Sequence, residues 1–135
     1  MTFSLEFQKR LKYDSLAPGI SVEAVLRRAN FETTCLAKID TGLEVGLFER
    51  GVGEALEIEI ESVTPRRFST LTGVFQAYAH EVVLETLGFE LQTVVYFAES
   101  YQVHRNILGR HGWLQLLRLG VVDYDSELYL SLYNE

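Results

Sequence analysis

The segment Lys38-Ile39-Asp40-Thr41-Gly42 ends a run of strand-forming residues and places an acidic side chain at the start of a tight turn. Apolar residues precede the aspartate, so we expect the strand that delivers it to be fixed in a core. Gly42 permits a backbone turn that a larger side chain would obstruct. Such a triplet also arises by chance, and an Asx turn, in which Asp40 bonds to backbone N–H groups, would account for it equally.

A second segment, Asn106-Ile107-Leu108-Gly109-Arg110, follows a run rich in β-branched and aromatic residues. A hairpin predicted around Thr72-Gly73 falls between the two segments. In this order the three features resemble the retropepsin-like aspartic peptidases, the retroviral and bacterial single-domain type. The resemblance covers about residues 20–133. It implies a single domain over residues 1–135 with an all-β fold, a closed acid-protease-like barrel with one short helix near the C-terminus.

The resemblance also implies roles for individual residues of the first motif. Asp40 matches the catalytic aspartate, and Thr41 matches the hydroxyl residue that hydrogen-bonds across a dimer axis. Gly42 matches the glycine whose neighbourhood accepts the substrate backbone. The tip of the predicted hairpin matches the family's substrate-covering flap, and its residues are Leu71, Thr72, Gly73 and Val74.

The second motif has implied structural roles. Ile107, Leu108 and Gly109 match the strand that supports the active-site loop. The family often pairs an acidic residue, two positions after the first motif, with the arginine of the second motif. Glu44 and Arg110 occupy these positions, so we expect an ion pair between them.

One Asp-Thr-Gly motif per chain, with no internal repeat, indicates that the chain acts as a homodimer. Peptide hydrolysis by carboxylates needs a general base to activate water and a general acid to protonate the leaving amine. Two carboxylates about 3 Å apart share one proton and so supply both functions. A two-fold axis would bring together two copies of Asp40, and this chemistry needs no metal or other cofactor.

Composition limits the possible partners. The chain has 135 residues, the size of one domain, and a net charge of −7, which disfavours nucleic acid and anionic membranes as partners. No stretch approaches a membrane span or a signal peptide, and Cys35 is the single cysteine. We therefore expect a cytoplasmic protein whose partners are a second copy and a peptide or protein substrate.

Apolar alternation predicts mostly strands. Leu56 to Glu61 alternates perfectly between aliphatic and acidic residues, which predicts a half-buried strand with a solvated glutamate face. Only Glu49–Ala55, weakened by two glycines, and Arg110–Arg118, with an apolar stripe that includes Trp113, have helical character. Many short strands favour a barrel or a sandwich. The other strands are predicted at Ile20–Arg28, Phe31–Ile39, Phe68–Leu71, Val74–Leu84, Phe89–Ala98, Gly120–Asp123 and Glu127–Tyr133.

Other chemistry has weaker support. His80, His104 and His111 are too scattered for a zinc pattern, and no Gly-x-Ser-x-Gly elbow occurs. Cys35 is better explained as a small core residue than as a nucleophile. A non-catalytic peptide-binding or assembly module on the same barrel is the alternative function, because Leu43 stands where retroviral members favour a small residue.

Overall fold

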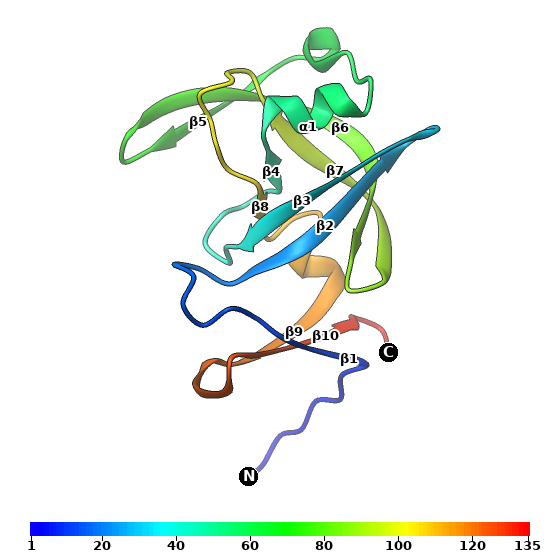
Figure 1. Ribbon diagram of the computed structural model, residues 1–135, viewed down its shortest axis with the longest axis vertical. Helices are drawn as coiled ribbons and strands as arrows, with labels where there is room; N and C mark the ends of the chain where they lie inside the picture. Colours follow the sequence, from blue (N-terminus) through cyan, green and yellow to red (C-terminus); the bar gives the residue numbers. More distant parts are fainter.

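The computed structural model describes residues 1–135 as a β-rich fold with one short α-helix (Figure 1). Strands dominate because β-branched and aromatic residues alternate with polar ones along most of the chain. The elements are β1 Lys9–Lys12, β2 Ser21–Arg28, β3 Phe31–Ile39, β4 Leu47–Phe48, α1 Arg50–Ala55, η1 Ile60–Ser62, β5 Arg66–Thr70, β6 Gly73–Thr86, β7 Phe89–Ala98, β8 Ile107–Leu108, η2 Leu114–Leu116, β9 Leu117–Val122, η3 Asp123–Asp125 and β10 Glu127–Leu132.

The larger sheet closes on itself like a barrel. Its strand order is β2-β3-β8-β4-β7-β6-β5, and an additional pairing of the first strand, β2, with the last strand but one, β6, closes the sheet. The 14-residue strand β6 makes this possible, because its second half pairs with β2 while its first half pairs with β5. The β5–β6 hairpin therefore extends beyond the barrel, as Figure 1 shows.

A three-stranded sheet, in the order β1-β10-β9, forms a second layer from the two ends of the chain. It lies below the barrel in Figure 1. Leu128 and Leu130 of β10 are fully buried and belong to the same apolar core as the barrel residues. The core therefore joins both sheets.

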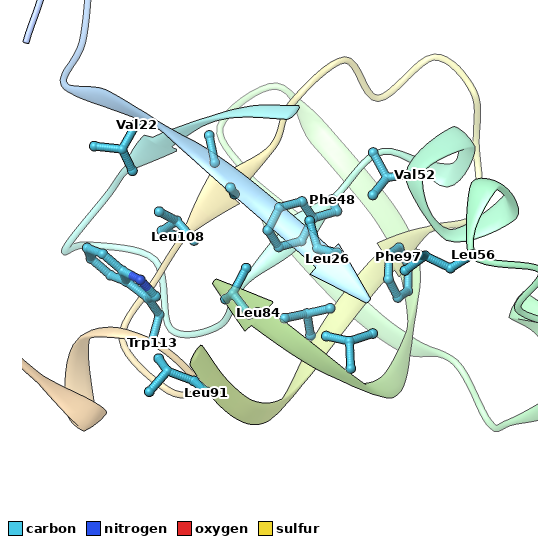
Figure 2. Close-up of a cluster of buried hydrophobic side chains, with 14 of the residues drawn as sticks. Val22, Leu26, Phe48, Val52, Leu56, Leu84, Leu91, Phe97, Leu108 and Trp113 are labelled. Carbon is cyan, nitrogen blue, oxygen red and sulfur yellow. The ribbon is translucent and has the colours of Figure 1, made fainter. Parts of the chain in front are cut away.

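The main core brings together residues from every part of the barrel (Figure 2). Phe48, Phe97 and Trp113 are its largest fully buried side chains. The indole N–H of Trp113 donates a hydrogen bond of 3.0 Å to Oγ1 of Thr86, so the one polar atom of this side chain has a partner. A buried donor without such a partner would be costly.

Most strand predictions are confirmed. The pair Ile20–Arg28 and Phe31–Ile39 forms the β2–β3 hairpin around Ala29. The hairpin around Thr72-Gly73 is formed by β5 and β6, and the next strand, β7, matches its predicted range. The all-β barrel-like fold class is confirmed with them. The α-helix at Arg50–Ala55 confirms the weaker of the two helical predictions.

The strand predicted at Leu56–Glu61 is wrong, although its burial pattern is right. Leu56, Ile58 and Ile60 are buried, and the three glutamates are exposed. The segment has no sheet partner, because Glu57 adopts a left-handed φ of 56° and the backbone N–H of Ile58 bonds back to Gly53 in the helix. Alternating burial here comes from an irregular segment lying over the core.

The helix predicted at Arg110–Arg118 is also wrong, and with it the placement of the single helix near the C-terminus. The chain instead turns at Gly112, makes the short 3-10 helix η2, and continues as strand β9. Trp113 is nevertheless buried, as its pattern predicted. A turn followed by a strand here has the apolar spacing that is typical of a helix.

No helix of the chain could span a bilayer.

The Trp113–Thr86 hydrogen bond gives a first test. Replacing Thr86 with valine keeps the side-chain shape but leaves the indole N–H buried without an acceptor, which should lower the free energy of unfolding by about 1–3 kcal/mol. Urea denaturation measures this change. Thr34→Val, at an exposed position of β3, is the matched control and should change stability little. Equal stability of both variants would contradict the assigned role of the hydrogen bond.

Candidate active site

Strand β8 lies between β3 and β4, and this arrangement shapes the loop that carries Asp40. Ile39 of β3 pairs with Leu108 in parallel, while Leu47 of β4 pairs with Ile107 in antiparallel fashion. The chain from β3 to β4 therefore has to cross over the end of β8. The residue at this crossing is Gly109, where an added Cβ would lie 2.1 Å from the Val45 carbonyl oxygen. Only glycine allows this close approach.

Backbone hydrogen bonds fasten the crossing loop on both sides. The N–H of Asp40 donates to the carbonyl of Leu108 at 3.0 Å. The N–H groups of Arg110 and His111 donate to the carbonyls of Leu43 and Glu44 at 2.9 and 2.7 Å. The segment after β8 thus holds the Asp40 loop in place, and the structure brings the two sequence motifs into direct contact.

Asp40 itself lies half-buried at the end of β3, and the next two residues are exposed. Its Oδ1 accepts a hydrogen bond of 2.9 Å from the N–H of Gly42, which is the Asx turn considered from the sequence. A Cβ on Gly42 would lie 3.2 Å from this oxygen. The turn therefore fixes one carboxylate oxygen and leaves Thr41 and Gly42 accessible at the surface.

The predicted ion pair between Glu44 and Arg110 is wrong. Glu44 pairs with Arg66 of β5 instead, with Nη2 of Arg66 2.6 Å from Oε2 of Glu44. The guanidinium of Arg66 also lies over the rings of Phe68, at 4.7 Å, and Tyr96, at 5.7 Å. These aromatic faces hold Arg66 close to Glu44, so Arg66 and not Arg110 is the partner of Glu44. Arg110 is exposed and has no ion pair or side-chain hydrogen bond.

A small apolar cluster lies under the β5–β6 hairpin, beside the Asp40 loop. Its buried members are Leu47, Ala77, Ala98 and Ile107. Partly buried side chains from the loop and the hairpin pack against them: Leu43, Phe68, Phe75, Tyr96 and Val103. We call this set the floor cluster. Leu43 therefore packs against apolar neighbours and does not project into solvent.

The hairpin tip matched to the flap is poorly covered. Leu71 is fully exposed and Val74 is more than half exposed, although both are apolar. Gly73 has a φ of 144°, which favours glycine at this position of the turn, and Thr70 Oγ1 donates to the Gly73 carbonyl at 3.0 Å. The tip is thus a defined turn with apolar side chains that face solvent in the single chain.

Arg66 and Tyr96 are site residues that sequence reasoning missed. Neither residue is among the site residues that the sequence predicts. For Arg66, the spacing of two from Phe68 was the available signal, since residues two apart in a strand share a face. Tyr96 gave no signal of its own, because its partners lie on another strand.

The other candidate groups do not form a second centre. Burial raises the pKa of the Cys35 thiol to about 11, with a smaller contribution from the charge of Glu49, so Cys35 is a poor nucleophile. His80 bonds to the carbonyl of Ile60, and His111 bonds to Gln115. No three histidine, cysteine or acidic side chains lie together as a metal site would require.

Comparison with known proteins identifies the fold. The solved structure of EIAV protease, a retroviral enzyme, in complex with the inhibitor HBY-793 is similar to this chain, with a TM-score of 0.58. The chain has a retropepsin-like fold. The similarity covers 74% of this chain and 88% of the viral chain, at 17% sequence identity. No protein-family model matches the chain, and a search of curated proteins found no similar sequence. Membership of the bacterial single-domain type stays a prediction.

The close contact at Gly109 predicts how the retropepsin-like barrel responds to one methyl group. Gly109→Ala would push its Cβ into the carbonyls of Val45 and Leu43, so we expect the free energy of unfolding to fall by at least about 2 kcal/mol. Chemical denaturation measures the change. In the control Gly51→Ala nothing lies within 4 Å of the new Cβ, and stability should stay level or rise by up to about 1 kcal/mol. A Gly109→Ala protein as stable as the control would refute the crossing geometry.

Proposed function

We propose that the chain is one subunit of a homodimeric aspartic endopeptidase in which Asp40 is the catalytic residue. The observation that carries this proposal is the position of Asp40 at the loop that crosses β8, where the N–H of Gly42 holds one carboxylate oxygen and backbone hydrogen bonds hold the loop. The retropepsin-like fold supports it, because EIAV protease has the same fold. Thr41 and Gly42 are exposed beside Asp40, where a partner subunit and a substrate could contact them.

A second copy is needed because one carboxylate cannot be both acid and base. Glu44, the next acidic residue along the chain, is already engaged by Arg66 at 2.6 Å. In the proposed dimer, two Asp40 carboxyl groups face each other and share one proton. A symmetric pair supplies the two functions from one residue type.

The reaction follows from that shared proton. The ionised carboxylate takes a proton from water, and the water oxygen attacks the carbonyl carbon of the peptide bond. The protonated carboxyl gives its proton to the carbonyl oxygen, which yields a tetrahedral gem-diol. The first carboxyl then gives the proton it took from water to the peptide nitrogen, the second carboxylate takes a proton from one gem-diol hydroxyl, and the C–N bond breaks to give a carboxylic acid and an amine. The pair then again holds a single proton.

The floor cluster and the β5–β6 hairpin define where a substrate would lie. An extended peptide placed over the floor cluster would pass under the flap tip and cover Leu71 and Val74, which are exposed in the single chain. Binding of a peptide as an added strand is a common mode of recognition. The substrate class we propose is therefore an extended or unfolded polypeptide segment.

Asp40→Asn tests the catalytic role and the need for two copies together. Asparagine is nearly isosteric but cannot exchange the proton, so the pure variant should keep its fold and lose cleavage. Wild type and variant, denatured and refolded together in known ratios, should show activity that falls with the square of the wild-type fraction. A cleavage assay on a quenched fluorescent peptide measures both. A linear fall would mean that each subunit acts alone, and cleavage by the pure variant would remove Asp40 from the mechanism.

The dimer itself is open to a direct mass measurement. Light scattering at roughly tens of micromolar protein should give twice the subunit mass of 15.4 kDa. The same mass should be found for Asp40→Asn, because the substitution removes only the ionisable carboxyl and leaves the rest of the proposed interface unchanged. A monomer mass over the whole concentration range would contradict the proposed enzyme and favour a binding module on this fold.

A further inference from the structure

An open pocket of about 480 Å3 borders the segment that follows the Asp-Thr-Gly motif. Its volume is within the range of ligand pockets and leaves ample room for one long side chain of a bound peptide. It combines apolar walls with a polar rim, which together fit a side chain with an aliphatic stem and a polar end. The walls include Val45, Val94 and Leu116, and the rim includes Glu44, Arg66 and His111.

The pocket continues the surface on which we place the substrate. Val94, Tyr96 and Ala98 alternate along β7 and therefore share one face of the strand. Ala98 belongs to the floor cluster, Val94 lines the pocket, and Tyr96 contributes to both. Val94 and Ala98 lie about 13 Å apart at the rise of a strand. An extended peptide that covers the floor cluster thus reaches the pocket within about four residues.

Arg66 gives the rim its charge. Glu44 occupies only part of its guanidinium, which has five N–H donors, and the side chain remains 40% exposed. Stacking on Phe68 and Tyr96 holds the group in one orientation. Hydrogen bonds with Tyr96 and then Glu44 raise the pKa of Arg66 further, so it stays charged at any working pH.

The charged lining residues Glu44 and Arg66 balance each other, so the pocket does not share the negative excess of the whole protein, which carries −7. Exposed Arg110, which has no ion pair, precedes the lining residue His111 in the chain. A carboxylate that enters the rim would find the N–H donors of Arg66 that Glu44 leaves open. An ammonium group cannot accept these hydrogen bonds.

We propose that this pocket is a subsite for an acidic side chain of the substrate, with Arg66 as the residue that determines the preference. The inference rests on the proposed function, because it places the pocket at the end of that enzyme's cleft. Glutamate suits the pocket better than aspartate, since its longer stem can follow the apolar walls while its carboxylate stays at the rim. The two-fold axis would repeat the subsite at both ends of the substrate.

Peptide binding to the Asp40→Asn protein tests the subsite without cleavage. Fluorescence anisotropy would compare extended peptides that differ only in having Glu, Gln or Lys three or four residues on either side of a central apolar pair. We expect the Glu peptides to bind about tenfold more tightly than the Gln peptides, and the Lys peptides to bind most weakly. Higher salt should reduce the difference, because the rim is partly exposed.

Arg66→Gln, in the same background, should give the Glu and Gln peptides equal affinity, and the ratio of the two affinities is the readout because Arg66 also holds Glu44 of the active-site loop. The matched control is Arg67→Gln, which removes the same charge from the next residue of β5. Arg67 is exposed, has no ion pair, and points to the opposite face of the strand. The Arg67→Gln variant should keep the full preference for Glu over Gln peptides.

The outcomes separate the subsite from the enzyme. Equal affinity for Glu and Gln peptides, or equal losses in Arg66→Gln and Arg67→Gln, would overturn the subsite. A preference for Glu that persists unchanged in Arg66→Gln would also overturn the role of Arg66. Cleavage of Glu and Gln peptides at equal rates by wild type would reject the subsite while the peptidase stands. Absence of both binding and cleavage would reject the peptidase together with its subsite.

Discussion

The crossing of the Asp40 loop over the end of β8 is the constraint on which the rest of the site depends. Gly109 brings two chain segments to within the distance that only glycine permits, and the carbonyls of Leu43 and Val45 occupy the space of its missing side chain. Hydrogen bonds from Arg110 and His111 then hold the loop. This crossing therefore fixes the Asp40 loop against β8, whose Ile107 belongs to the floor cluster.

Much of the fold could be predicted because local patterns determine it. The β2–β3 and β5–β6 hairpins follow from apolar alternation interrupted by short turns. The errors at Leu56–Glu61 and Arg110–Arg118 have a common cause. Periodicity reports which side chains are buried, and both segments bury the expected residues. Hydrogen-bond partners decide whether such a segment becomes a strand, a helix or neither, and these partners are distant in sequence.

The site residues also differ in whether local sequence patterns could predict them. The two motifs identified Asp40 and Gly109, because each contains a residue type that its backbone position requires. The partner of Glu44 could not be found from sequence, since Arg66 reaches it from a strand far along the chain and is held there by Phe68 and Tyr96. This exchange of partners links the flap hairpin to the active-site loop and leaves Arg110 free. The charge that sets the proposed substrate preference thus arises from the same contact that the motif comparison missed.

The account as a whole depends on two copies of one carboxylate sharing a proton across an axis of symmetry. A crystal structure of the protein would measure the separation between the two Asp40 side chains directly. The account predicts a two-fold dimer in which the nearest carboxylate oxygens lie about 3 Å apart, at the spacing of a shared proton. A dimer that holds the two carboxyl groups far apart, or a lattice containing only separate subunits, would contradict it.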